Sequence, residues 1–195
     1  MRLRAFALGL ALAFPPLAIG SLDGPPAASA SVAINLTLDE LVIRASYVVV
    51  ATAAERHSTW ENLAGGRRIV TYTRLKVDQP VVGEAGPEVW VRTLGGAVGK
   101  IGQHVSGEAR FTTGEKALFF LSKVEGAVVV TGLAQGHYPV VTKEGTTKLA
   151  SSPDTGKLLP AAGPSIPARD VLLGASLESA LGMVQRARRA HDARK

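Results

Sequence analysis

The chain has 195 residues, of which 46% are hydrophobic, 5% aromatic and 19% charged, and it carries a formal net charge of +6 with no cysteine. This length suits one domain with a complete core, and the missing cysteines exclude disulfides, thiol catalysis and cysteine-ligated zinc. Residues 31–184 carry 15 basic and 14 acidic side chains, whereas the last eleven residues carry five basic and one acidic. A nearly neutral body argues against a nucleic-acid partner.

The first thirty residues have the order of a secretory signal peptide. Arg2 and Arg4 precede an apolar stretch from Ala5 to Ile19, and the small residues Ala27–Ala30 suit an export peptidase. The stretch is too short for a membrane span. We therefore expect cleavage between Ala30 and Ser31 and a protein of the periplasm or the extracellular space; an uncleaved anchor helix is the alternative.

Short apolar runs separated by glycine and charge predict an all-β domain over residues 31–151. A helix is expected first, at residues 35–46, where Thr37 and Glu40 have the spacing of a capping box. The expected strands are Ser46–Ala54, Arg67–Asp78, Glu88–Leu94, Lys116–Lys123 and Ala127–Leu133, followed by a hairpin at residues 137–151 that turns at Glu144–Gly145. Pro139 is expected to make the first arm of that hairpin an edge strand. Five or six short antiparallel strands with a lead-in helix predict a small closed barrel, because closure hides the strand edges.

Two segments follow the predicted barrel. Residues 152–168 are rich in proline and glycine and predict a linker across the surface. Over residues 169–195, four apolar side chains recur at helical spacing and predict a basic amphipathic helix that packs on the body, with Ser176 as a cap: Leu173, Leu177, Leu181 and Val184. Its basic end suits either a solvated helix terminus, stabilised by the helix dipole, or contact with an anionic envelope surface.

The stretch LGGAVGKIG, residues 94–102, is similar to a phosphate-binding loop but lacks its diagnostic positions. Such a loop needs a glycine five residues before the Gly-Lys pair and a Ser or Thr after it, and this chain has Leu94 and Ile101 there. A glycine-rich excursion of the barrel is the prediction. Histidines 57, 104, 137 and 191 lack the spacing of a metal site, and no motif marks a nucleophile, so neither an enzyme nor a cofactor is predicted.

Taken in order, Leu41–Ala53, Gly66–Thr93 and Gly114–Leu133 resemble the netrin-like fold, an oligomer-binding (OB) type of barrel shared by tissue inhibitors of metalloproteinases and by modules of netrins and complement proteins. The resemblance implies that the amine and carbonyl of the mature first residue, Ser31, followed by Val32, chelate the zinc of a secreted protease. In the animal inhibitors cystines hold this segment. Here only Ile34, Leu36 and Leu38, packed on the barrel, are expected to replace them.

A plain binding module is the other expectation. The predicted loop between the first two strands, Glu55–Arg68, brings together one aromatic side chain and several cations: Arg56, His57, Trp60, Arg67 and Arg68. Loops at this place meet ligands in barrels of this class, although Trp60 also suits a plug at one barrel end. The leading prediction is an exported, monomeric, non-enzymatic protein-binding or envelope-interaction module. Inhibition of a secreted zinc metalloprotease and glycan binding are the alternatives.

Overall fold

The structure, a computed structural model, describes residues 32–143 and 145–195. The predicted signal peptide and Ser31 lie outside the described residues. Among the residues that are described, no helix is long and apolar enough to cross a membrane.

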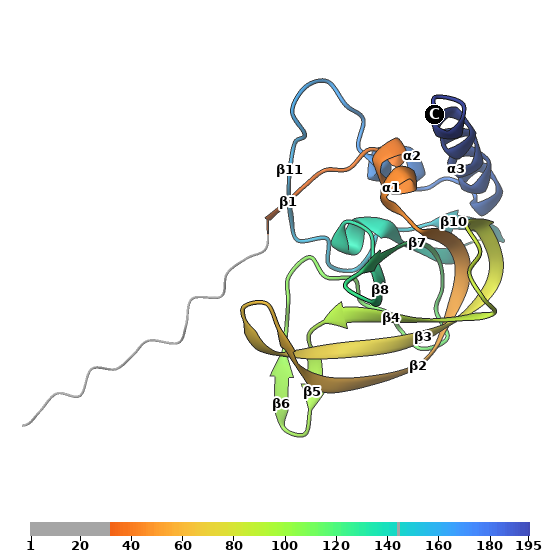
Figure 1. Cartoon of the computed structure of the whole chain (residues 1–195). Coiled ribbons are helices and arrows are strands. Elements are labelled where there is room, and N and C mark those ends of the chain that lie inside the picture. The colour runs from red at the N-terminus through yellow and green to blue at the C-terminus, as the bar shows by residue number, and fades with distance from the viewer. Residues whose placement is uncertain (1–31, 144) are drawn as a thin grey trace, which may run out of the picture.

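Strands are the main regular structure of the described chain, and the helices gather at one side of them (Figure 1). The strands are β1 (Val32–Ile34), β2 (Tyr47–Leu63), β3 (Gly66–Val82), β4 (Glu88–Leu94), β5 (Gly96–Val98), β6 (Ile101–Gln103), β7 (Lys116–Val124), β8 (Ala127–Val130), β9 (His137–Lys143), β10 (Thr146–Leu149) and β11 (Lys157–Leu159). The helices are α1 (Leu38–Arg44), the 3-10 helix η1 (Leu133–Gly136), α2 (Ala168–Leu172) and α3 (Leu177–Asp192). The mostly β character predicted from the sequence is confirmed.

One large sheet organises the domain. Its seven strands lie in the order β10-β9-β7-β2-β3-β4-β8, and β7 also pairs with β8. All of these neighbours are antiparallel except β4 and β8, which join in parallel through Val91 and Val128. The order corrects one expectation: β9, which holds Pro139, lies between β10 and β7 and is no edge strand. Pro139 is tolerated because it lies at the end of the short β7–β9 pairing, opposite Ala117.

The long β2–β3 hairpin replaces the predicted loop. From Glu55 opposite Arg74 to Leu63 opposite Gly66 the pairing is unbroken, and the chain turns only at Ala64–Gly65. The expectation of a loop over Glu55–Arg68 is therefore wrong. The outer half of β2 carries polar side chains on both faces, so no apolar alternation shows in its sequence.

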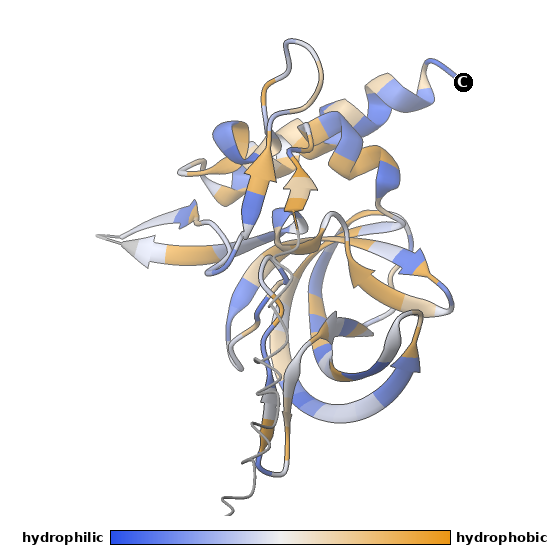
Figure 2. Ribbon diagram, turned by 90° about the vertical axis from the view of Figure 1, so that its left-hand side faces the viewer, coloured by the Kyte–Doolittle hydropathy of each residue, from blue (hydrophilic) through white to orange (hydrophobic). Residues whose placement is uncertain are grey.

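The sheet separates two hydrophobic cores. Val48 and Val50 of β2 face the core shared with the helices, whereas Val49 and Ala51 face the core enclosed by the curved strands. Both sides of this part of β2 are buried, which explains its continuous valine run. Figure 2 shows the C-terminal helix with hydrophobic residues beside the sheet and hydrophilic residues toward its free end.

The helical and linker expectations are partly corrected. Ser176 caps α3 by accepting a hydrogen bond from the Ser179 N–H at 3.1 Å, as predicted. The predicted single helix over residues 169–195 is instead α2 and α3, because the chain turns at Gly174 with a φ of +75°. The predicted linker, residues 152–168, contains β11, which pairs in parallel with β1.

Candidate functional site

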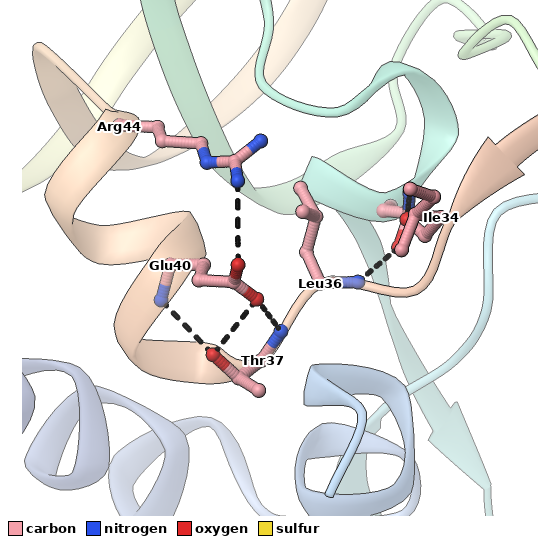
Figure 3. Close-up of polar contacts among 6 residues, drawn as sticks. Ile34, Leu36, Thr37, Glu40 and Arg44 are labelled. Atoms are coloured by element: carbon pink, nitrogen blue, oxygen red, sulfur yellow. Dashed lines mark hydrogen bonds and ion pairs between the residues drawn. The ribbon is translucent and has the colours of Figure 1, made fainter. Parts of the chain in front are cut away.

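The backbone on either side of Leu36 is fixed by hydrogen bonds without any covalent link (Figure 3). The Gln135 side-chain amide clamps it from both directions: its Oε1 accepts from the Leu36 N–H at 2.8 Å, and its Nε2 donates to the Ile34 carbonyl at 3.0 Å. Asn35 N–H donates to the Leu159 carbonyl at 2.8 Å, and the Leu36 carbonyl accepts from Ala168 N–H at 2.8 Å. Each of these partners lies far along the chain. The start of the domain is thus held by its last third.

Helix α1 continues this anchoring. The Thr37 hydroxyl accepts from Glu40 N–H at 3.2 Å, and the Glu40 carboxylate accepts from Thr37 N–H at 2.8 Å, so the predicted capping box is confirmed. The hydrogen bond from the Thr37 backbone lowers the pKa of Glu40, and the charge of Arg44 acts in the same direction. Arg44 pairs with Glu40 at 3.3 Å (Figure 3).

The N-terminal strand presents apolar side chains to solvent. Val32 and Ile34 of β1 are 52% and 59% exposed, and Leu159, directly opposite Ile34 on β11, is 43% exposed. Because paired residues share a face of a sheet, the three side chains form one surface, which we call the N-terminal ridge. A groove of about 520 Å³ adjoins it, lined in part by Ala33, Ile34 and Leu36. The expectation that Ile34 packs on the barrel is wrong; Leu36 is the buried anchor, at 6% exposure.

The predicted aromatic and cationic cluster is divided between the two faces of the hairpin. Side chains alternate along a strand and opposite residues share a face, so Arg56, Trp60 and Arg67 lie on the concave face and His57 and Arg68 on the convex face. On the concave face, the Arg67 guanidinium lies 4.9 Å from the Trp60 ring centre. Trp60 is half-buried beneath that cation. The five side chains do not form a single surface.

The convex face carries an aromatic group that the sequence did not indicate. His57 stacks on Tyr72 with ring centres 5.5 Å apart and meets the edge of Trp90 at 5.4 Å. The Tyr72 hydroxyl donates to Glu61 at 2.7 Å, and this hydrogen bond raises the pKa of Tyr72. These contacts join β2, β3 and β4, and they stabilise the sheet by cross-strand pairing.

A polar cavity of about 230 Å³ opens on the concave side. Its lining includes hydroxyls from β3 and β4, Thr71, Thr73 and Thr93, and the carboxyl of Glu108. Glu108 is only 6% exposed, and burial raises its pKa to about 7, against the opposing effects of the Leu94 backbone and the charge of Arg92. This cavity was not predicted from the sequence, although the threonine positions on the apolar face of β3 were a signal for it.

A second buried polar group joins three distant segments. His137 contacts Ser152 Oγ through Nδ1 at 3.0 Å and Glu115 Oε1 through Nε2 at 2.9 Å. Because a carboxylate only accepts, Nε2 carries the proton. The ring also stacks on Phe119. The cavity beside Ser152 has a volume of about 20 Å³, enough for one water and too small for a substrate. The trio satisfies a buried histidine and offers no accessible nucleophile.

The glycine-rich stretch proves to be a small hairpin, β5–β6, packed against β2 and β3. A side chain at Gly96 would place its Cβ 2.2 Å from Thr71 Oγ1, so glycine permits the close approach. The hairpin turns at Gly99–Lys100, and no helix follows to complete a phosphate site. In the described part of the chain, no three His, Asp or Glu side chains lie close enough to hold a metal.

The chain matches no protein-family model, no curated protein and no solved structure.

Proposed function

We propose that this chain is an exported, non-enzymatic protein-binding module built on an OB-type barrel, and that it engages its partner through the N-terminal ridge. The strand pairings support the barrel. The pairings lead from β2 through β3, β4, β8 and β7 and back to β2. The one parallel pairing in this ring joins β4 and β8, which are its third and fifth strands in chain order. This connectivity agrees with the netrin-like resemblance.

The anchoring of the ridge is the observation that carries the proposal. A flexible terminus loses binding free energy because it must become ordered when it binds, whereas a segment that is already ordered does not. Here Gln135, Leu159 and Ala168 hold residues 34–36 through four hydrogen bonds. The apolar side chains of Val32 and Ile34 are left exposed on that ordered backbone. Exposed apolar residues grouped beside a groove are typical of a protein-binding surface.

A photo-crosslinking residue placed at position 34 tests the proposal. The matched control is position 101, because Ile34 and Ile101 are the same residue type at 59% and 56% exposure, and Ile101 lies on the distant β5–β6 hairpin. Both proteins are incubated with the native extracytoplasmic fraction. We expect a discrete crosslinked protein from position 34 and none from position 101. Identical crosslinking patterns from the two positions refute the ridge as the binding surface.

Inhibition of a secreted zinc metalloprotease is the narrower form of this proposal. It requires a free amine on Ser31, so protein beginning at Ser31 is compared with protein carrying one additional alanine before it. Loss of inhibition on extension supports chelation by the terminus. Inhibition that survives the extension rules out chelation while leaving the ridge itself to be judged by the crosslinking result.

A further inference from the structure

We infer that the polar cavity on the concave side binds a small zwitterion of amino-acid size, with its ammonium group at Glu108 and its carboxylate at Arg56 and Arg110. This site is separate from the N-terminal ridge and does not depend on the proposed function.

Two buried polar groups in the cavity have no side-chain partner. Thr73 is 3% exposed and Glu108 6% exposed. Within the described residues, neither the Thr73 hydroxyl nor the Glu108 carboxyl forms a hydrogen bond or ion pair with another side chain. The neighbouring Thr71 differs, because its hydroxyl donates to the Gly95 carbonyl at 2.6 Å and accepts from Ser58 at 2.8 Å. The Glu108 carboxyl accepts a hydrogen bond from the Leu94 backbone, and a carboxylate has several acceptor positions, so a ligand that donates to the remaining ones is favoured.

Opposite charges are separated across the cavity. Glu108 lies inside, and both Arg56 and Arg110 line the cavity while remaining exposed. Neither arginine forms an ion pair with a carboxylate in the described chain, whereas Arg74 and Arg92 on the neighbouring strands are both paired. Arg56 Nη1 donates to the Phe111 carbonyl at 3.1 Å, which fixes its guanidinium at the opening. The Arg110 guanidinium contacts the His104 ring. A buried acid and two guanidinium groups without a carboxylate partner match a molecule with both charges.

The cavity is small, and hydrogen bonds hold one of its walls in place. A volume of about 230 Å³ is below the range of drug-sized sites and suits a smaller molecule. One wall, residues 103–111, is held by Asp154, whose Oδ1 accepts from Gly107 N–H at 3.2 Å and Gly156 N–H at 3.0 Å. Asp154 also lies 3.4 Å from His104 Nε2. Because the wall is held in place without the ligand, little ordering is required on binding.

Titration by NMR tests the inference. Free α-amino acids are added to the purified protein, one at a time to 10 mM, and propionate and propylamine serve as ligands with only one of the two charges. We expect at least one amino acid to shift the amide signals of residues 103–111 and to bind about tenfold or more tightly than either control. It should also lower the pKa of the Glu108 carboxyl, seen in its ¹³C signal, because a nearby cation favours the ionised form.

Three variants locate the two charges. Glu108→Gln and Arg110→Gln should each weaken binding by about tenfold or more. Arg67→Gln should leave it unchanged, because Arg67 packs on Trp60 and does not line the cavity. The amide spectrum of each variant verifies its fold. The inference is overturned if no amino acid shifts the cavity signals, if propionate binds as tightly as the amino acids, or if Glu108→Gln binds like the parent protein.

Discussion

Replacing Gln135 with alanine should release the N-terminal ridge without unfolding the domain. The side chain contributes two hydrogen bonds, to Leu36 N–H and the Ile34 carbonyl. Net hydrogen-bond contributions of about 0.5–1.5 kcal/mol each predict a loss of about 1–3 kcal/mol in the local stability of this segment. If the segment opens independently, the amide of Asn35, which donates to Leu159, should exchange with solvent about 5- to 150-fold faster.

Native-state hydrogen exchange measures this effect, and two comparisons sharpen it. The Leu149 amide, bonded to the Ala175 carbonyl at 2.9 Å, reports on a distant part of the domain and should be unaffected. Gln135→Glu keeps the acceptor for Leu36 but places a carboxylate oxygen against the Ile34 carbonyl oxygen, which repels it, so the Asn35 amide should again exchange faster than in the parent protein. An unchanged Asn35 amide, or an equal acceleration at Asn35 and Leu149, would refute the idea that Gln135 holds the ridge locally.

Three further predictions concern the interior and the hairpins. The pKa of Glu108 is raised from 4.5 to about 7, so the free energy of unfolding should fall by up to about 3 kcal/mol as the pH rises from about 5 to 7. Because Arg56, Arg92, Arg110 and His104 share its surroundings, the contribution of Glu108 is isolated as the difference in urea-unfolding free energy between the parent protein and Glu108→Gln. A difference that does not vary with pH would contradict the raised pKa of Glu108. Gly96→Ala should lower the free energy of unfolding by about 1–3 kcal/mol from backbone strain alone, because the φ of Gly96 is +130°, and the clash with Thr71 adds to this loss. Gly99 has a φ of +60° and open space around it, so Gly99→Ala should lower the free energy of unfolding by only about 1 kcal/mol. Equal melting temperatures for the two variants would contradict this reasoning. His137→Phe should lower the urea midpoint by the equivalent of about 1–3 kcal/mol, since it leaves the Ser152 hydroxyl buried without a partner; an unchanged midpoint would show that the trio adds nothing to stability.

Local sequence patterns predicted the elements whose determinants are local. The strand at Glu88–Leu94 and the capping box of Thr37 with Glu40 were predicted with the bounds and contacts that the structure has. The strand Arg67–Asp78 was predicted within β3, but the outer half of β2, which pairs with it, was missed because its concave face borders a polar cavity. Ser58 of β2, which shares a hydrogen bond with Thr71, therefore occupies a position where an apolar core residue would have shown the strand period.

The candidate sites were harder to predict, because their contacts join residues far apart in sequence. Gln135 lies 99 residues from Leu36, and no local signal pairs them. Glu108 follows a glycine-rich stretch, a context that predicts a surface carboxylate, yet its side chain is buried. The aromatic and cationic residues of the hairpin were recognised as a group, and the strand period separates them onto two faces. The binding role proposed for them stays a prediction.

The parallel pairing of β1 with β11 also determines when the domain can be completed. During synthesis, Val32 leaves the ribosome long before Lys157, its partner in the pairing. The large sheet can already form from the intervening chain, while the first strand must wait for an element near the end. Until Lys157–Leu159 has been synthesised, β1 therefore lacks the partner strand that holds it, and the last third of the chain closes that interval.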